Sequence, residues 1–312
     1  MDCVVTGGAG FIGSNLVDAL LARGDRVAVI DDLSTGKRSN LERAFAAGVQ
    51  LYELDVRDAD GIAAVFAQVR PQLVFHLAAQ IDVRRSIEDP AADAEVNVLG
   101  AINVLAAAHA SGARRVVNTS TGGGLYGDAD VLPTPEDHAI HALAPYGTSK
   151  QAAEGYFEMY TRLHGLSTVS LRYGNVYGPR QDVHGEAGVV AIFCGCLLER
   201  RTPQIFGDGR QTRDWVDVAD VVRANLLAAD ADISGPINIA GGEETSVLDL
   251  VDALRDVGAA RGLALPAPDF RPARPGEVSR SRLDVSRARE GLGWAPEVSL
   301  RDGLELILAG LI

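Results

Sequence analysis

The first half of the chain alternates short apolar runs with longer segments of helical periodicity. The short runs are rich in Val and Ile and apolar on both faces, which is typical of buried parallel strands. They lie at Cys3–Thr6, Arg26–Ile30, Gln50–Leu54, Leu73–His76, Arg115–Ser120 and Thr168–Arg172. The helical segments lie at Phe11–Ala22, Ile62–Val69, Ala91–Ala110 and Tyr146–His164. Such alternation predicts βαβ units, and therefore an α/β fold with a doubly wound parallel sheet of the Rossmann type.

The regular alternation ends near Gly174, beyond which Gly and Pro become frequent. One more helix, about Val218–Ala229, and one more strand, about Pro236–Ile239, are expected to rejoin the sheet. We therefore expect a dinucleotide-binding domain over residues 1–174, with about 214–240 returning to it. Residues 175–312 are expected to form mainly a smaller α/β domain for a substrate.

Composition narrows the class of protein. A hydrophobic content of 47% allows a large buried core, and a net charge of −13 argues against general binding to nucleic acid or to an anionic membrane. No apolar run in the sequence reaches the roughly 20 residues of a spanning helix, and the start lacks the pattern of a signal peptide. The three cysteines, Cys3, Cys194 and Cys196, are expected to be reduced thiols of a cytoplasmic protein. No metal site is expected.

A glycine-rich turn separates the first strand from the first helix. Gly7, Gly10 and Gly13 give a GxxGxxG spacing, with Phe11 and Ile12 inside the turn. Such glycines permit a tight turn and a close approach of backbone to a pyrophosphate, whose charge the helix N-terminus favours. The sequence therefore predicts a dinucleotide site.

The residue that ends the second strand indicates which dinucleotide binds. Asp31, followed by Asp32, can accept hydrogen bonds from a ribose diol and repels a 2′-phosphate, which favours NAD over NADP. Lys37 and Arg38 lie nearby and could instead recruit a phosphate.

The ends of later strands supply the rest of the expected cofactor site. Asp55 and Val56 follow the third strand, where an adenine can be read. Small residues in the stretch after the fourth strand let the chain pass close to the cofactor. That stretch is Leu77, Ala78, Ala79 and Gln80.

Tyr146 and Lys150 form a YxxxK pattern, which on a helix puts both side chains on one face. A fixed ammonium would stabilise the phenolate and lower the tyrosine pKa, so that Tyr146 can act as a general base on an alcohol. Thr121, at the end of the fifth strand, is the candidate for a hydroxyl that assists it. Thr119 and Ser120 can be structural, since such residues commonly close turns.

Taken together, these motifs resemble the extended short-chain dehydrogenase/reductases, and specifically the UDP-glucose 4-epimerase family. The resemblance covers essentially the whole chain. It rests on TGGAGFIG at 6–13, HLAAQIDVRRS at 76–86, YGTSK at 146–150, NVYGPRQ at 175–181, GEAGVVAIF at 185–193, FGDGRQTRD at 206–214 and RPGE at 274–277.

The resemblance implies roles for further residues. Asn97, Thr119 and Tyr173 would contact the cofactor, together with Tyr146 and Lys150. The substrate side would consist of Thr121, Tyr146, Asn175, Val189, Phe206, Arg213, Arg274 and Glu277. In that assignment Asn175 and the two arginines hold the diphosphate, Glu277 the ribose, and Phe206 with Val189 the uracil.

The activity implied is NAD-dependent 4-epimerisation of a UDP-sugar. The sugar is oxidised at C4, the keto sugar rotates about its diphosphate, and hydride returns to the other face. NAD stays bound and is regenerated in each turnover. The resemblance also implies a homodimer through the helices near Ala91–Ala110 and Tyr146–His164.

Departures from the family pattern leave the sugar open between glucose, glucuronate and N-acetylglucosamine. Gly174 stands where relatives carry a larger residue. The missing side chain would leave room for a C6 carboxylate, which Arg84 and Arg85 could recognise. Alternatively, the backbone at this position requires a glycine. Ser281 stands at a gate position where a small residue is typical of enzymes that admit N-acetylated sugars.

The rival functions are less well supported by the residues around Thr121. Gly122 and Gly123 follow it, and neither can transfer a proton as the Asp-Glu pair of a sugar 4,6-dehydratase does. Counting back from Tyr126 instead of along the strand would shift the assignment of the hydroxyl by one residue. A non-catalytic NAD-binding protein would be expected to have lost Tyr146 or Lys150.

Overall fold

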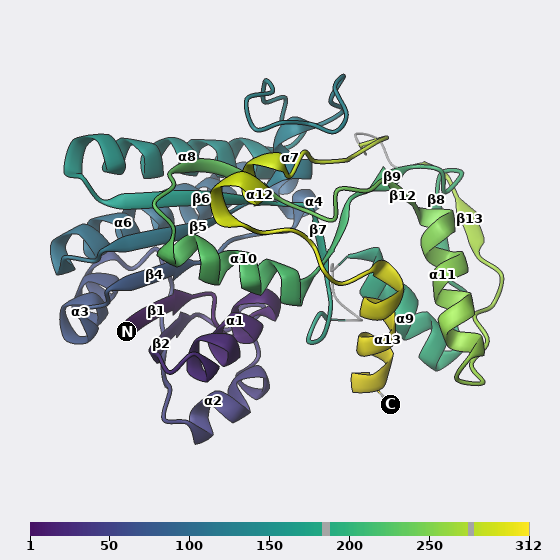
Figure 1. The fold of residues 1–312 in the computed structure, drawn as a ribbon, viewed down its shortest axis with the longest axis horizontal. Coiled ribbons are helices and arrows are strands. Elements are labelled where there is room, and N and C mark those ends of the chain that lie inside the picture. Colours follow the sequence, from purple (N-terminus) through teal and green to yellow (C-terminus); the bar gives the residue numbers. More distant parts are fainter. Residues whose placement is uncertain (183–187, 274–277, 312) are drawn as a thin grey trace.

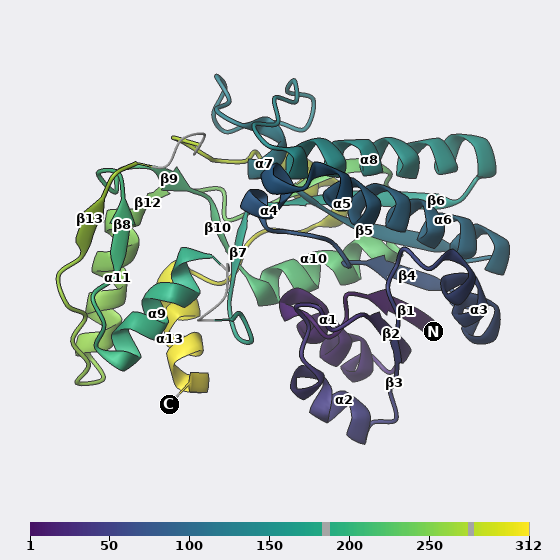
Figure 2. The ribbon, with the colours of Figure 1, turned by 180° about the vertical axis from the view of Figure 1, so that it is seen from behind.

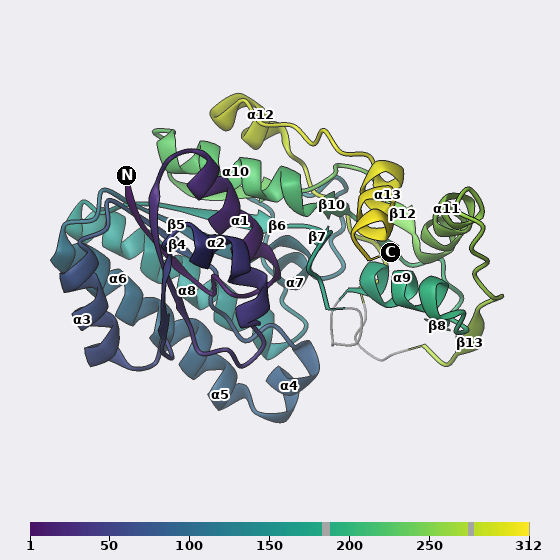
Figure 3. The ribbon, with the colours of Figure 1, turned by 90° about the horizontal axis from the view of Figure 1, so that it is seen from below.

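The computed structural model of the chain describes residues 1–182, 188–273 and 278–311. A broad sheet with helices on both sides forms a large lobe, and a second lobe of helices and short strands lies at one end of it (Figure 1). Seen from below, α9, α11 and α13 stand apart from the helices that cover the sheet (Figure 3).

The sheet of the large lobe has seven strands in the order β11-β6-β5-β4-β1-β2-β3, and every pairing in it is parallel. The strands are β1 (Asp2–Thr6), β2 (Arg26–Asp31), β3 (Gln50–Glu53), β4 (Leu73–His76), β5 (Arg115–Thr121), β6 (Ser167–Tyr173) and β11 (Gly235–Ile239). The order reverses between β1 and β4, and ligands of open α/β sheets bind at such a reversal. The predicted Rossmann-type fold is confirmed.

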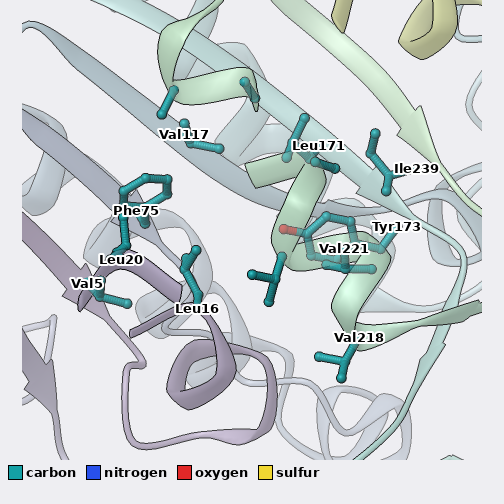
Figure 4. Packing of buried hydrophobic residues seen from close by; sticks show 14 of the residues in the cluster. Val5, Leu16, Leu20, Phe75, Val117, Leu171, Tyr173, Val218, Val221 and Ile239 are labelled. Atoms are coloured by element: carbon teal, nitrogen blue, oxygen red, sulfur yellow. The ribbon is translucent and has the colours of Figure 1, made fainter. Parts of the chain in front are cut away.

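Alternating side chains of the strands fill the two faces of the sheet. On β1, Cys3 and Val5 join one core, whereas Val4 joins the other. The first core packs under α1 (Phe11–Ala22) and α10 (Val218–Asp230), where Leu16 and Val221 are fully buried (Figure 4). Burying one such side chain contributes about 1.5–3 kcal/mol, so each face is stabilised by many contacts of this size.

The opposite face is covered by α3 (Ala59–Val69), α6 (Gly100–Ser111) and α8 (Pro145–His164) (Figure 2). Phe66, Leu105 and Phe157 from these three helices share one core. α8 begins with Pro145 in its first turn and ends at Gly165, whose φ of +67° suits a residue without a side chain. The catalytic candidate Tyr146 therefore lies in the first turn of a long, well-anchored helix.

The run of helix before β5 is not one regular helix. α5 (Pro90–Ala94) is followed by a π-turn, η2 (Glu95–Leu99), and then by α6. By length and composition Pro90–Ser111 could cross a membrane, contrary to the expectation that no segment of the chain is long and apolar enough to do so. In the structure Ala101, Leu105 and Ala108 are fully buried against the sheet lobe, so this helix packs as part of a protein core.

The smaller lobe has its own core, built from α9 (Val189–Glu199), α11 (Val247–Ala259) and α13 (Leu300–Leu311). Its strands pair in twos as β10-β7, β12-β9 and β13-β8. They are β7 (Asn175–Tyr177), β8 (Gln204–Phe206), β9 (Thr212–Arg213), β10 (Trp215–Asp217), β12 (Thr245–Ser246) and β13 (Asp269–Arg271). β11 and α10 belong to the sheet lobe, and the division into two domains stays a prediction.

Short helices complete the chain between these elements. They are η1 (Arg38–Leu41), α2 (Glu42–Ala46), α4 (Val83–Glu88), α7 (Gly122–Tyr126) and α12 (Ser286–Leu292).

Candidate functional site

The glycine-rich turn lies against the segment that follows β4. Gly7 has a φ of +70°, and a Cβ on it would stand 2.6 Å from the Ala78 backbone nitrogen. A Cβ on Gly13 would stand 2.1 Å from the Gly7 carbonyl oxygen, so neither position accepts a side chain. Gly10 caps α1 without a side chain, and the first N–H groups of that helix point toward the turn. These features form a cradle that fits the pyrophosphate of a dinucleotide.

Asp31 ends β2 beside this cradle and is buried. Its two carboxylate oxygens accept backbone hydrogen bonds from Ala9 and Leu33, both at 2.9 Å. Burial raises the pKa of Asp31, and these two hydrogen bonds oppose the shift. A carboxylate held so firmly has lone pairs left to accept from a ribose diol. Asp32 is exposed and accepts from Ser34.

The two cations near Asp31 have acidic partners. Lys37 Nζ lies 3.1 Å from an Asp182 oxygen. Arg38 pairs with Glu53 at 3.4 Å and stacks over the Phe45 ring. These ion pairs weaken the reading in which Lys37 and Arg38 bind a 2′-phosphate, which favours NAD.

The ends of β3 and β4 carry the other expected cofactor residues. Asp55 is half-buried and paired with Arg57, which holds the pKa of that carboxyl below its ordinary value. Val56 is buried and in tight contact with Gly100. Leu77, Ala78, Ala79 and Gln80 are all partly exposed along one edge of the site.

Tyr146 and Thr121 come together at the end of β5. The Thr121 hydroxyl oxygen accepts from the Gly124 backbone N–H at 3.2 Å, which leaves its proton to donate. That hydroxyl forms a side-chain hydrogen bond with Tyr146, and the bond lowers the tyrosine pKa. The neighbouring hydroxyls face elsewhere, since Thr119 pairs with Tyr173 at 3.3 Å and Ser120 Oγ is buried without a partner among the described residues. The count along the strand, rather than back from Tyr126, thus agrees with the geometry.

Lys150 is buried one turn further along α8, and its ammonium has a backbone partner. Its Nζ donates to the Thr119 carbonyl oxygen at 2.9 Å. Burial lowers the pKa of Lys150 to about 8. Burial also raises the pKa of Tyr146 to about 12, and the lowering of that pKa by Lys150 stays a prediction.

Asn97, Tyr173 and Ile12, the other predicted cofactor residues, lie in different environments. The Asn97 amide exchanges two hydrogen bonds with the Gln80 backbone, at 2.9 and 3.0 Å. Tyr173 is only 4% exposed, and its hydroxyl accepts from Asn225 at 2.7 Å, so most of its ring serves the core. Ile12 and Phe11 are half-buried at the start of α1.

The residues expected to bind the substrate line the other lobe. Asn175 begins β7, Phe206 ends β8 and Val189 begins α9; all three are partly exposed. Arg213 donates to the Thr212 and Val278 carbonyl oxygens at 2.8 and 2.7 Å. The other predicted residues of this group, Arg274 and Glu277, lie outside the described residues.

The structure decides one of the questions about the sugar pocket. A Cβ on Gly174 would stand 2.7 Å from the Asp214 carbonyl oxygen and 3.0 Å from the Ala240 Cβ. Gly174 is therefore a backbone requirement and opens no room beside a sugar. Ser281 is buried next to the glycines that follow Thr121, since a Cβ on Gly123 would stand 3.8 Å from the Ser281 hydroxyl. Arg84 and Arg85 are exposed on α4, which packs at the start of α8.

Sequence reasoning missed several polar groups packed behind Tyr146 and Lys150. Asp93 is buried and accepts a hydrogen bond from the Asn97 side-chain amide. The Ser149 hydroxyl accepts from the same amide at 3.0 Å. The buried His76 ring forms a hydrogen bond with the Thr6 hydroxyl at 2.8 Å. The one sequence signal for Asp93 is its spacing: it lies four residues before Asn97, which on a helix places the two on one face. Such a spacing alone is common and does not indicate a functional residue.

A protein-family comparison now identifies the class. Residues 3–240 match the model of the NAD dependent epimerase/dehydratase family. The chain belongs to this family. A UDP-glucose 4-epimerase from Mycolicibacterium smegmatis is 47% identical over 97% of this chain and 96% of its own length.

Solved epimerases share the whole architecture of this family member. The UDP-glucose 4-epimerase of Thermotoga maritima, solved with UDP-glucose, superposes with a TM-score of 0.95 at 44% identity and covers 100% of this chain and 98% of its own. The Thermus thermophilus UDP-glucose 4-epimerase, solved with NAD, gives 0.91 at 41% identity and covers 99% and 98%. The expected family, fold and cofactor class are confirmed.

Proposed function

We propose that the chain is an NAD-dependent UDP-sugar 4-epimerase of the UDP-glucose/UDP-galactose type. The observation that carries the proposal is the pairing of Thr121 with Tyr146 above a dinucleotide cradle, in a chain 47% identical to a UDP-glucose 4-epimerase. The identity extends through the smaller lobe as well as the sheet, so it includes the part expected to bind the sugar nucleotide.

The cofactor site fits NAD by its own geometry. The Gly7–Gly13 turn leaves no space for side chains where the pyrophosphate approaches, and Asp31 stands at the end of β2 for the ribose. When bound, NAD accepts hydride from C4 and later returns it, so no cofactor is consumed.

The chain's own residues handle the proton. Tyr146, as phenolate, accepts the proton of the sugar 4-hydroxyl and gives it back after hydride has returned to the opposite face. The Thr121 hydroxyl bonds Tyr146 in the protein alone, and would turn its proton to the C4 oxygen of the sugar once the substrate is bound. Burial raises the pKa of Tyr146 to about 12, so a positive charge brought in by the bound cofactor would favour the phenolate.

The smaller lobe supplies the binding energy for the part of the substrate that does not react. Arg213, with Arg274, would clamp the diphosphate, and Phe206 with Val189 would hold the uracil. Asn175 and Glu277 would complete this grip. A clamp on the diphosphate leaves the keto sugar free to turn, which the return of hydride to the other face requires.

The test is to incubate the purified protein with UDP-glucose, without added NAD, and follow the H4 and anomeric protons by NMR. We expect UDP-galactose to appear. Tyr146→Phe should reduce the rate by about 10²–10⁴-fold while NAD stays bound, because only the proton acceptor is lost. Formation of a keto or deoxy sugar, or normal turnover by the variant, would contradict the proposal.

A second candidate substrate is UDP-N-acetylglucosamine. It is favoured by the small Ser281 and the side-chain-free Gly123 that face one another beside Thr121. The glucuronate alternative rests on Arg84 and Arg85 alone now that Gly174 is explained. The same NMR assay with the three sugars separates these alternatives by rate.

We further propose a homodimer through the helices near Ala91–Ala110 and Tyr146–His164, which include η2, α6 and α8. Leu99 in η2 and Tyr156 and Leu163 in α8 are large side chains that stay 53%, 38% and 71% exposed. Large exposed apolar groups are typical of an interface. Sedimentation equilibrium should give twice the chain mass, and Leu163→Glu should shift the protein toward monomer.

A cytoplasmic location, without nucleic-acid or membrane partners, completes the proposal. Cys3, Cys194 and Cys196 are buried and free, which suits a reducing compartment. The net charge of −13 disfavours polyanionic partners.

A further inference from the structure

A buried carboxylate lies behind the catalytic tyrosine and takes no part in the steps above. Asp93, on α5, is 1% exposed. Its Oδ1 accepts hydrogen bonds from the side-chain amides of Gln80 at 2.8 Å and Asn97 at 3.2 Å. Its Oδ2 is sealed from solvent and has no hydrogen-bond partner within residues 1–182, 188–273 and 278–311. A buried carboxylate in this position destabilises the fold unless a positive charge lies close to it.

The helix that follows Asp93 contains a π-turn, and this turn determines where the Asn97 side chain lies. The π-turn η2 has Asn97 at its centre, and π-turns in helices occur frequently at functional sites. From there the Asn97 amide reaches both the Gln80 backbone and the Ser149 hydroxyl, which in turn donates to the Tyr146 carbonyl oxygen at 2.9 Å. Asp93 thus anchors the residues that join the segment after β4 to the first turn of α8.

Lys150 is the buried cation that the structure links to Asp93, because Asn97 bonds both Asp93 and Ser149, the residue before Lys150 on α8. Two carboxylates act on the buried Lys150 ammonium, those of Glu154 and Asp93. Glu154 already has a cation of its own, because Arg172 binds it with two nitrogens, the nearer at 2.7 Å. Asp93 has no ion pair of that kind among the described residues, so its charge is available to balance Lys150.

We propose that Asp93 is a positioning residue of the reaction, which fixes Gln80 and Asn97 beside Tyr146 and is the counter-ion of the buried Lys150 ammonium. It contacts neither the sugar nor the cofactor. The inference rests on the proposed epimerase function for its kinetic readout only.

The charge of Asp93 has a defined effect on pH dependence. It raises the pKa of both Tyr146 and Lys150. The other charged or titratable groups around this pair are His76 on β4, Glu154 on α8 and Arg172 on β6. Burial and the nearby Lys150 lower the pKa of His76 to about 3, so it stays neutral over the working range. Removing the Asp93 charge should therefore move the titration of Tyr146 and of Lys150 to lower pH.

The first experiment separates charge from hydrogen bonding. Asp93→Asn keeps a carbonyl oxygen that can accept from Gln80 and Asn97 but carries no charge. We expect both limbs of its kcat–pH profile to move to lower pH. Asp89→Asn, an exposed cap on the same helix, is the matched control and should leave the profile unchanged. A profile of Asp93→Asn that coincides with that of the wild type would overturn the proposal.

The second experiment needs no activity and decides the matter if the wild type proves not to be an epimerase. Asp93→Asn is made in the wild type and in Lys150→Met, and the melting temperatures are compared as a double-mutant cycle. If the Asp93 carboxylate is the counter-ion of Lys150, Asp93→Asn should lower the melting temperature clearly less in the Lys150→Met background than in the wild type. An Asn variant that folds only in that background would support the proposal equally. Equal losses in the two backgrounds would overturn it.

Discussion

The two lobes differ in how their sequences determine their structure. In the sheet lobe each of the strands β1 to β5 is followed by helical structure, and strands neighbouring in sequence mostly pair in space. In the smaller lobe the paired strands have only two or three residues, and β13 pairs with β8 across more than sixty residues of chain. The contrast indicates that the residues expected to bind the cofactor are placed by local patterns, whereas those expected to bind the substrate are placed by long-range packing.

The contrast between the two lobes is tested most strongly by a substitution that fills the dinucleotide cradle with a side chain. In Gly13→Ala the new Cβ would meet the Gly7 carbonyl oxygen at 2.1 Å, with backbone on both sides of the contact. We expect near-complete loss of bound NAD and of activity, measured by the absorbance of cofactor released on denaturation. Gly310→Ala, in α13 with open space around it, should retain both. Normal NAD content in Gly13→Ala would show that the cradle is misassigned.

The next largest effect is expected from the ion pair under α8. Glu154 and Arg172 are both buried, and Arg172 also donates to the Tyr126 hydroxyl at 2.8 Å. Glu154→Ala should lower the free energy of unfolding by about 3–5 kcal/mol, because it leaves a guanidinium buried without its carboxylate. Urea denaturation measures this, with the exposed Glu158→Ala on the same helix as control. A loss no larger than that of the control would mean that water or another group replaces the partner.

A smaller, pH-dependent effect should come from His76. Burial holds its pKa near 3, below the ordinary 6.5, so the unfolded chain binds a proton that the folded chain does not. Stability is therefore full above pH 6.5 and falls as the pH drops toward 3; at pH 5 the loss is about 2 kcal/mol. His76→Asn, which can still bond Thr6, should flatten this part of the stability curve. Identical acid slopes in variant and wild type would exclude His76 as the cause.

The smallest effect should appear in the smaller lobe. Phe206→Ala removes the ring expected beside the uracil, and KM should rise by about tenfold. NAD content should be unchanged, because the ring lies outside the sheet lobe. Phe270→Ala, on the neighbouring strand and 53% exposed, is the control. A loss of NAD from Phe206→Ala would contradict the independence of the two lobes.

Much of the sheet lobe could be predicted from the sequence, because its signals are local. The strand predicted at Thr168–Arg172 is found at Ser167–Tyr173, and the helix predicted at Phe11–Ala22 has those bounds. The YxxxK spacing placed Tyr146 and Lys150 on one helix, and the strand count placed Thr121 next to Tyr146.

The remainder depends on contacts between distant segments. The direction of the Lys150 ammonium is set by the Thr119 carbonyl, which a helical spacing does not reveal. The π-turn around Asn97 and the burial of Asp93 depend on how α5 packs on α8. Gly174 is explained only by the approach of Asp214 and Ala240, which are distant in sequence and lie at the ends of other strands.

The central claim is that one hydride leaves C4 and returns to it within a single bound complex. The most direct measurement uses UDP-glucose deuterated at C4, incubated with the enzyme without added NAD, with the product examined by NMR. The account predicts UDP-galactose that retains the deuterium at C4 in full. Deuterium lost to water, or moved to another carbon, would contradict it.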